Sequence, residues 1–359
     1  MTEPALPLDR VVHVASGREW RGGERQVLLL AKGLRERGLD QVVVTRRNGR
    51  LAAELTEAGI PVHPVAWRMA VSPGAALATI AEARRGRTLL HAHDAHSLTV
   101  AAVAARLSHR PFVVTRRIDL PLRRLGFWPG AARIIAISGA VRSHLEASGI
   151  GPDRIVVVPS GIAPPIAAPR AEPTGIAPVR PAPVALTIGA LTAEKGHALL
   201  LETAARLKPL HPDLRWIFAG DGPLRAALEA RTRELGLTAV VEFRGDLPDP
   251  RILLAEATVF VSASAHEGLG TSILDAMAAD VAVVATAVGG VVEVLGDGAG
   301  VLVDRAHPEA LAAAITGLLC NETARRNVTQ KAADRVRSYT VERMATGVLS
   351  VYRSVLLSP

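Results

Sequence analysis

The chain of 359 residues contains few cysteines and few aromatic residues. Cys320 is its single cysteine, which excludes an internal disulfide and favours a reducing compartment. Phenylalanine, tyrosine and tryptophan together make up only 3% of the residues, so a hydrophobic core must consist mainly of alanine, valine, leucine and isoleucine. Hydrophobic residues at 49% and charged residues at 21% are typical of a globular protein, and the length fits two domains.

Membrane-directing segments are also missing from the sequence. The opening MTEPALPLDR has neither a basic start nor an apolar stretch, so we expect no signal peptide. No apolar run approaches the length that spans a bilayer. We therefore expect a cytoplasmic protein. The net charge of +8 would allow peripheral contact with the anionic inner face of a membrane.

The common nucleotide-binding motifs are absent. Residues 220–223 (GDGP) and 268–270 (GLG) both lack the third glycine of the Gly-x-Gly-x-x-Gly fingerprint, and residues 189–195 lack the glycine that precedes the lysine of a Walker A loop. These absences argue against a dinucleotide oxidoreductase and an ATPase. The basic residues form scattered pairs without interleaved aromatics, so nucleic acid is not an expected partner.

What the sequence does contain is an alternation of β-branched strands and amphipathic helices. In the first half we expect strands at 11–15, 41–45, 60–65, 88–92, 112–115, 133–137 and 155–158. In the second half we expect strands at 184–188, 215–219, 240–243, 258–262, 281–285 and 300–303, with helices at about 196–208, 223–235, 249–256, 271–279, 289–295 and 308–319. Residues 321–357 are expected to be helical, with a break near 338–339.

This alternation predicts two doubly wound α/β domains with parallel sheets, at residues 1–162 and 184–339. Residues 163–183 carry proline at a density that excludes helix and central strand, which indicates an extended linker. Ligands of such sheets bind beyond the carboxyl ends of the strands, so the cleft between the domains is the expected site.

The stretch 261–293 is the strongest candidate site. Glu267 follows a strand, glycines follow Glu267, and a helix begins at Thr271, an arrangement that suits a polyhydroxylated anion. Asp275 lies about two helical turns further along. The two carboxylates could be an acid/base pair, or both could accept hydrogen bonds from sugar hydroxyls, and their separation favours ligand binding.

A cation follows another strand of the second half. Lys195 opens a helix after the strand 184–188, where a lysine favours an anion such as a diphosphate, although a solvated lysine is the alternative. Gly220 and Gly222 most simply form a turn into a helix that starts at Pro223, and lining the site would be a second role.

In the first half, three segments could line the site. The glycine-containing turn 21–25 offers bare amides to a phosphate or sugar, or is an ordinary turn. His91, His93 and His96 suggest a metal, but further ligands are missing, so a polar lining of the cleft is favoured. The pair 116–117 follows a strand and could hold a phosphate or an acidic acceptor, or be a surface pair.

These motifs resemble those of the family 4 glycosyltransferases of GT-B fold. The similar segments, in chain order, are 20–24, 137–138, 158–162, 189–196, 219–223, 266–278, 281–286 and 289–293. The resemblance implies two Rossmann-like domains that face each other across a cleft, with a final helix at about 340–359 packed back on the first domain. It also implies transfer of a sugar from a nucleoside-diphosphate sugar, with retention of configuration and without a metal or other cofactor. The segment 20–24 is similar to the acceptor-side loop of bacterial envelope-glycan enzymes, so the expected acceptor is a cell-envelope glycan, such as lipopolysaccharide, or a lipid-linked precursor.

The resemblance also implies residue roles. Glu267 would contact the donor sugar, Lys195 would neutralise the leaving diphosphate, and Asp275 would bind the ribose hydroxyls. The other donor-binding candidates are Gly268, Leu269, Gly270, Thr271, Gly189, Gly220, Gly222 and Arg244. The candidates on the acceptor or phosphate side are Arg21, Gly22, Gly23, Glu24, His93, Asp94, Arg116 and Arg117.

Three positions depart from the family pattern. The family usually has glutamate where Asp275 stands and often arginine where Ala190 stands. Many members have a histidine where this chain has the pair 116–117, which favours an anionic acceptor. The alternatives to a transferase are a GT-B epimerase or phosphorylase, and a non-catalytic protein that binds nucleotide sugars.

Overall fold

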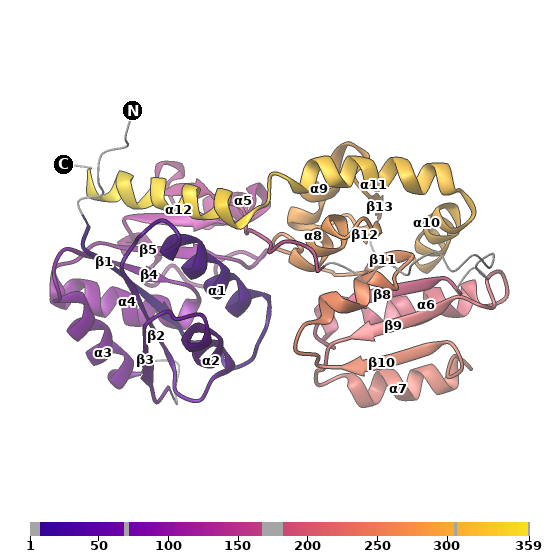
Figure 1. Ribbon diagram of the computed structural model, residues 1–359, viewed down its shortest axis with the longest axis horizontal. Helices are drawn as coiled ribbons and strands as arrows, with labels where there is room; N and C mark the ends of the chain where they lie inside the picture. The colour runs from indigo at the N-terminus through magenta and orange to yellow at the C-terminus, as the bar shows by residue number, and fades with distance from the viewer. Residues whose placement is uncertain (1–7, 68–71, 167–181, 305–306, 358–359) are drawn as a thin grey trace. The chain divides into compact units, whose positions relative to one another are not determined.

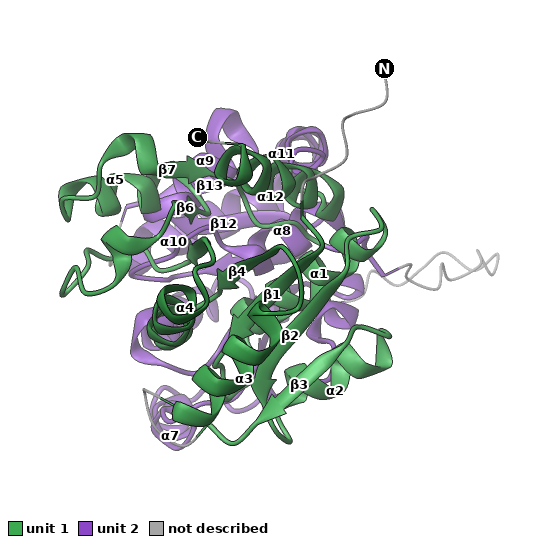
Figure 2. Cartoon of the chain, turned by 90° about the vertical axis from the view of Figure 1, so that its left-hand side faces the viewer, with its two compact units in different colours: residues 1–162, 339–359 green, residues 163–338 purple. Residues whose placement is uncertain are grey.

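The computed structural model describes residues 8–67, 72–166, 182–304 and 307–357. The chain divides into two compact units (Figure 2), of which unit 1 comprises residues 1–162 and 339–359 and unit 2 comprises residues 163–338. Each unit contains one parallel sheet with helices packed on it, which confirms the predicted fold class. Most of the predicted linker, residues 167–181, lies outside the described residues.

Unit 1 is built on a seven-stranded sheet with the strand order β3-β2-β1-β4-β5-β6-β7. The strands are β1 (Arg10–Ala15), β2 (Gln41–Arg46), β3 (Val62–Val65), β4 (Thr88–Ala92), β5 (Phe112–Arg116), β6 (Arg133–Ala136) and β7 (Ile155–Val157). The helices are α1 (Gly22–Arg35), α2 (Arg50–Glu57), α3 (Pro73–Ala83), α4 (Ala95–Ser108), α5 (Gly139–Ala147) and α12 (Val341–Leu356). The central strands β1 and β4 are buried along almost their whole length, which their runs of valine and leucine allow.

The last helix, α12, packs on α1 within unit 1 (Figure 1). Gly33 of α1 permits this approach, since a Cβ atom there would lie 2.9 Å from Val341 Cγ1. The guanidinium of Arg37 donates to the carbonyl of Glu342 at 2.9 Å and to the hydroxyl of Thr346 at 3.1 Å. The end of the chain is therefore part of the first structural unit.

Unit 2 is built on a six-stranded sheet with the strand order β10-β9-β8-β11-β12-β13. The strands are β8 (Val184–Ile188), β9 (Arg215–Ala219), β10 (Val241–Gly245), β11 (Val259–Ser262), β12 (Ala282–Thr286) and β13 (Val301–Val303). The helices are α6 (His197–Leu207), α7 (Arg225–Glu234), α8 (Thr271–Ala278), α9 (Gly289–Leu295), α10 (Pro308–Cys320) and α11 (Glu322–Val336). Trp216 and Phe218 of β9 belong to the core beneath α6 and α10.

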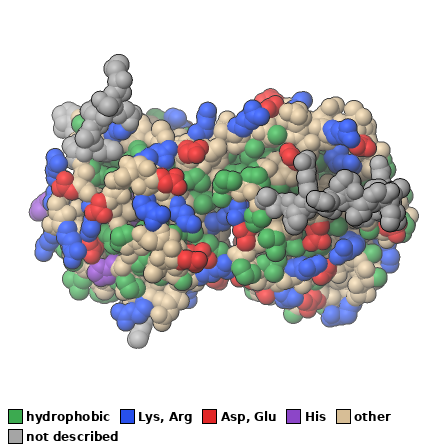
Figure 3. Space-filling model, viewed as in Figure 1, with side chains coloured by type: hydrophobic (Ala, Val, Ile, Leu, Met, Phe, Trp, Pro, Cys, Tyr) green, Lys and Arg blue, Asp and Glu red, His purple; other side chains and the backbone are tan. Residues whose placement is uncertain are grey.

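The segment 250–255 differs from the expected α-helix, because it forms the 3-10 helix η4 (Pro250–Ala255). Asp249 begins this short segment and accepts a hydrogen bond from the backbone N–H of Arg251 at 3.1 Å. Among the described residues, no helix combines the length and the apolar character needed to cross a bilayer. Basic and acidic side chains are interspersed on the face shown in Figure 3.

Candidate active site

Lys195 and Glu267 meet at the carboxyl edge of the sheet in unit 2. Lys195 ends the 3-10 helix η3 (Ala193–Lys195) after β8, and Glu267 lies in the loop between β11 and α8. The Lys195 Nζ atom is 2.6 Å from Glu267 Oε2, and the Ser264 hydroxyl donates to the same oxygen at 3.3 Å. The side chains of Lys195 and Glu267 are 28% and 19% exposed. Both charged groups are therefore held by neighbouring side chains and still accessible to a ligand.

Backbone hydrogen bonds tie three loops together around this pair. The N–H of Gly290, at the start of α9, donates to the carbonyl of Glu267 at 3.0 Å. The N–H of Ala265 donates to the carbonyl of Glu194, the neighbour of Lys195, at 2.8 Å. The positions of the carboxylate and the ammonium group are therefore fixed through main-chain contacts as well as through their own ion pair.

Glycines allow these loops to approach one another. A Cβ atom on Gly220 would lie 2.1 Å from the carbonyl oxygen of Gly189, and the φ of Gly220 is 134°. A Cβ atom on Gly290 would lie 2.2 Å from the carbonyl oxygen of Gly268. Since real side chains never tolerate such distances, close backbone packing explains both glycines.

The other donor-side candidates differ in position. Gly270 immediately precedes α8 as its N-cap, with a φ of 82°, and Thr271 is the first helical residue, so the helix N-terminus lies directly after the Glu267 loop. The side chain of Leu269 is buried in the core. Asp275 is 5% exposed on α8, and its charge helps to raise the pKa of Arg251, after the larger effect of the hydrogen bonds from Arg251 to Asp249.

Arg244 lies apart from the pair of Lys195 and Glu267. It is exposed on the edge strand β10 and forms an ion pair with Glu242 at 2.5 Å. Strand β9 separates β10 from β8, the strand that precedes Lys195. No contact joins Arg244 to Lys195 or Glu267 among the described residues, but the next residue, Gly245, accepts a hydrogen bond from the N–H of the donor-side candidate Gly220 at 2.8 Å.

At the carboxyl edge of the sheet in unit 1, Arg117 is the central cation. Its guanidinium donates to the carbonyl of His93 at 2.8 Å and lies 3.3 Å from His93 Nδ1. Burial lowers the pKa of Arg117 to about 10, and the negative charges of Glu24 and Asp94 oppose this effect. Arg117 therefore stays protonated at neutral pH, close to two carboxylates.

Asp94 is held by several hydrogen bonds. It accepts from the N–H of Ser16 at 2.8 Å and from its hydroxyl at 2.5 Å. It also caps α4 by accepting from the N–H groups of His96 and Ser97 at 3.0 and 2.8 Å. These contacts make Asp94 a structural carboxylate that joins β1 to the start of α4.

Glu24 lies in the first turn of α1, which begins at Gly22 and Gly23. Burial raises the pKa of Glu24, against the effect of the backbone hydrogen bonds it accepts, one of which comes from the N–H of Arg21 at 3.2 Å. The Arg21 side chain itself pairs with Glu19 at 2.5 Å.

The neighbouring arginines 116 and 117 have different surroundings. The guanidinium of Arg116 lies 5.6 Å from the centre of the Trp128 ring and donates to the carbonyl of Leu120 at 2.9 Å. Only Arg117 of this pair contacts His93.

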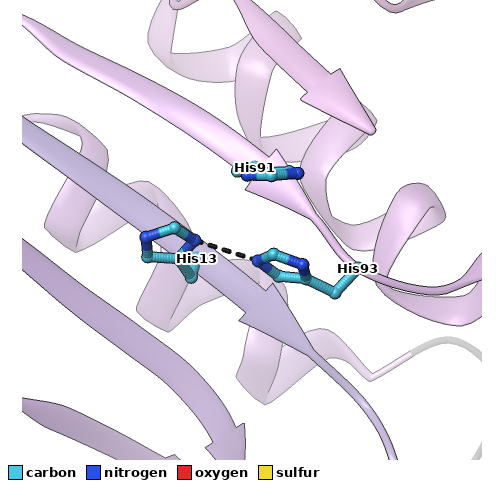
Figure 4. Close-up of side chains that lie close together, drawn as sticks. All are labelled: His13, His91 and His93. Atoms are coloured by element: carbon cyan, nitrogen blue, oxygen red, sulfur yellow. Dashed lines mark hydrogen bonds between the residues drawn. The ribbon is translucent and has the colours of Figure 1, made fainter. Parts of the chain in front are cut away.

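Three buried histidines of unit 1 lie together (Figure 4). His13 Nδ1 is 2.9 Å from His93 Nε2, while His91 bonds the Tyr352 hydroxyl through Nδ1 and the Thr115 hydroxyl through Nε2, both at 2.7 Å. His96 is exposed on α4 and takes no part in the cluster. His13 was not among the predicted site residues, although a histidine within the apolar strand VVHVA is a usable signal, and the structure places it in register with His91.

The ligand atoms of His13, His91 and His93 all lie within 4.8 Å of one another, so that the three side chains could converge on a metal ion. Burial lowers the pKa of each histidine, so all three are neutral at pH 7, as metal ligands must be. However, both nitrogens of His91 already have partners, and the Arg117 guanidinium adjoins His93. The cluster therefore fits a hydrogen-bonded core better than a metal site, and the expectation of a metal-free enzyme stays a prediction.

Comparison with known proteins matches both halves of the chain to families. Residues 20–164 match the family model described as glycosyltransferase family 4, and residues 174–335 match the model described as glycosyl transferases group 1. The alpha-maltose-1-phosphate synthase of Mycolicibacterium smegmatis is 28% identical over 312 residues, covering 75% of this chain and 79% of that protein. The lipopolysaccharide core biosynthesis glycosyltransferase LpsE of Rhizobium meliloti is 34% identical over 151 residues, or 42% of this chain and 43% of LpsE.

A solved structure with the same fold is HepE of Anabaena in complex with UDP and glucose. It superimposes with a TM-score of 0.84 at 21% identity, covering 96% of this chain and 99% of HepE. The chain is therefore an enzyme of the glycosyltransferase class with the GT-B fold. It belongs to the family 4 glycosyltransferases.

Proposed function

We propose that this glycosyltransferase takes its sugar from a nucleoside-diphosphate sugar, retains the anomeric configuration and needs no metal ion. The observation that carries the proposal is the 2.6 Å contact between Lys195 and Glu267 at the carboxyl edge of the sheet in unit 2. An ammonium group suits a diphosphate, and a carboxylate suits sugar hydroxyls. The structure of HepE with UDP and glucose supports a nucleotide sugar as the donor.

In the proposed mechanism, charge stabilisation replaces the metal. Lys195 and the N-terminus of α8 neutralise the negative charge that develops on the departing diphosphate. Glu267, oriented by Lys195 and Ser264, accepts hydrogen bonds from the donor sugar. Asp275 binds the ribose.

The acceptor oxygen attacks the anomeric carbon from the face that the phosphate leaves. The bond from that carbon to the phosphate oxygen breaks, and the bond to the acceptor oxygen forms. The acceptor proton passes to the departing phosphate, so no strong protein base is required.

The acceptor side of the proposal rests on unit 1. Arg117 supplies a partly buried positive charge next to Glu24, and the glycine turn at Gly22 and Gly23 is at least partly exposed. A cation at this edge suits an anionic acceptor. We assign the acceptor to a cell-envelope glycan or a lipid-linked precursor, which the similarity to an enzyme of lipopolysaccharide core biosynthesis supports.

A thermal-shift panel of UDP-, GDP- and ADP-sugars tests the donor. One donor should raise the unfolding temperature of the full chain in proportion to the logarithm of its concentration, because a ligand at 100 times its Kd adds about 2.7 kcal/mol of stability. Glu267→Gln should lower the affinity for that sugar donor to the affinity for its nucleoside diphosphate alone. Glu202→Gln, on the surface of α6, is the matched control and should bind like the wild type.

Failure of every donor to stabilise the chain would contradict the proposal. So would a Glu267→Gln variant that distinguishes the sugar donor from the nucleoside diphosphate as well as the wild type does. Turnover in the presence of a chelator tests metal independence, and the proposal expects no change.

A further inference from the structure

Residues 118–127, here termed the 118–127 loop, carry an exposed apolar surface in unit 1. The loop connects β5 to the 3-10 helix η1 (Trp128–Gly130). Ile118, Leu120, Leu125 and Phe127 are 52%, 41%, 42% and 47% exposed. Apolar side chains of this size are normally buried, and four of them in ten residues form a surface that water solvates poorly.

The 118–127 loop buries its acidic residue and exposes its basic ones. Its single acidic residue, Asp119, is 4% exposed, and its Oδ1 atom lies 3.2 Å from Nε2 of His144. Its two arginines, Arg123 and Arg124, are exposed. The loop thus buries its acid and presents only apolar and positively charged side chains.

Contacts on the inner side hold the loop in place. The N–H of Leu122 donates to the hydroxyl of Ser148 at 2.9 Å, next to the end of α5. Arg116 bonds the carbonyl of Leu120 at 2.9 Å and lies over the ring of Trp128, which is buried. The outward direction of the apolar side chains is therefore a property of the fold.

We propose that the 118–127 loop docks on an anionic phospholipid surface. Exposed leucine and phenylalanine side chains would enter the boundary between headgroups and acyl chains, while Arg123 and Arg124 would bind headgroup phosphates. A partner protein would also cover apolar side chains, but the exposed charges of this loop are all positive, which matches the uniform negative charge of such a lipid surface.

The position of the loop agrees with this assignment. It begins directly after Arg117, the cation of the proposed acceptor side. Docking would therefore bring the acceptor-side residues close to lipid headgroups. This link to a lipid-linked acceptor rests on the proposed function, whereas lipid docking itself does not.

Co-sedimentation of the full chain with vesicles tests the docking. Vesicles of phosphatidylglycerol and phosphatidylethanolamine should bind the wild type, and vesicles of phosphatidylcholine should bind it much less. Arg123→Glu combined with Arg124→Glu should weaken binding by at least about thirtyfold, because each lost arginine removes on the order of a fivefold gain and the new carboxylates are repelled by the anionic lipid. Leu125→Ser combined with Phe127→Ser should weaken it about tenfold.

Matched controls come from the same unit. Arg84→Glu with Arg85→Glu changes the net charge equally, and Leu77→Ser with Leu107→Ser removes apolar side chains of α3 and α4 that are even more exposed, at 68% and 56%. Both controls should bind vesicles within about twofold of the wild type, since they leave the docking surface intact. Unfolding temperatures, with and without the donor found in the panel, should match the wild type for all four variants.

The proposal would be overturned if the control variants lost as much vesicle binding as the loop variants. It would also be overturned if the wild type bound phosphatidylcholine vesicles as strongly as vesicles that contain phosphatidylglycerol. A chain that dimerises with concentration through these side chains and does not bind vesicles would assign the loop to a protein interface and overturn it too. Because donor stabilisation is measured on the same variants, failure of docking and failure of the proposed function are separate results.

Discussion

The pair of Lys195 and Glu267 matters for geometry more than for stability. Both side chains are partly exposed, and ion pairs of this kind contribute little to the free energy of unfolding. Their contact aims an ammonium group and a carboxylate at the same point before any ligand arrives. Preorganised charges of this kind stabilise a charged transition state without the cost of reorientation.

Arg116 and Arg117 are consecutive in the sequence but make different contacts. Side chains alternate between the two faces of a strand, so neighbours at the end of β5 point in different directions. Arg116 packs over Trp128 and supports the 118–127 loop, while Arg117 contacts His93. Their adjacency in the sequence suggested one pair with one role, whereas the structure gives them separate surroundings.

At the scale of elements, the candidate donor site depends on close contact between the loops that follow β8 and β9. Gly220→Ala should destabilise unit 2 by roughly 3 kcal/mol or more, because its Cβ atom would meet the carbonyl of Gly189 and its φ is positive. Gly317→Ala, inside α10 with no atom near its Cβ position, should stabilise the unit by about 0.5–1 kcal/mol. Urea unfolding measures both changes, and a neutral effect at position 220 would contradict the packing role.

The elements themselves were largely predictable. Alternating β-branched runs and helical periodicity predicted the strands of both sheets and the α-helices of unit 2 to within two residues, because local patterns determine them. The 3-10 form of 250–255 was missed, since a segment that begins with Asp-Pro is compatible with either helix type. The hydrogen bond between His91 and Tyr352 joins residues 261 positions apart, and no local pattern indicates such a contact.

The candidate site was predictable in its residues and less so in its contacts. Lys195 and Glu267 each follow a strand, and the parallel topology places strand ends at one edge, but their direct contact depends on loop conformations. The same limit applies to the cluster of His13, His91 and His93, whose members come from β1 and the end of β4.

At the scale of the whole molecule, buried histidines predict acid sensitivity in both units. Burial lowers the pKa of His13 in unit 1 and of His197 in unit 2 to about 4, and the charge of Lys195 adds to the effect on His197. An unfolded histidine binds its proton near pH 6.5, so between pH 6.5 and 4 the unfolded chain holds more protons than the folded chain. Stability is therefore complete above pH 6.5 and is lost as the pH falls toward 4.

Because the unfolded chain takes up protons at these two histidines, each should lower the free energy of unfolding by roughly 2 kcal/mol between pH 7 and pH 5. Urea unfolding at the two pH values measures the loss. His197→Leu should abolish the part of the pH-dependent stability loss that comes from His197. The substitution should change the stability at pH 7 little, because neither ring nitrogen of His197 has a hydrogen-bond partner in the described part of the chain. Equal stability of the wild type at pH 7 and pH 5 would contradict this role of the histidines.

The central proposal is that Lys195 stabilises the departing diphosphate of a nucleotide sugar. The rate at which nucleoside diphosphate is released from the donor found in the thermal-shift panel measures this directly. The two variants to compare are Lys195→Ala and Lys208→Ala. Lys208 is the control because it is a surface lysine of unit 2 whose ammonium group donates to the carbonyl of Gly236. Lys195→Ala should lower the turnover rate about 100- to 1000-fold with an unchanged unfolding temperature, whereas Lys208→Ala should match the wild type. A Lys195→Ala enzyme that works within about threefold of the wild-type rate would contradict the proposal.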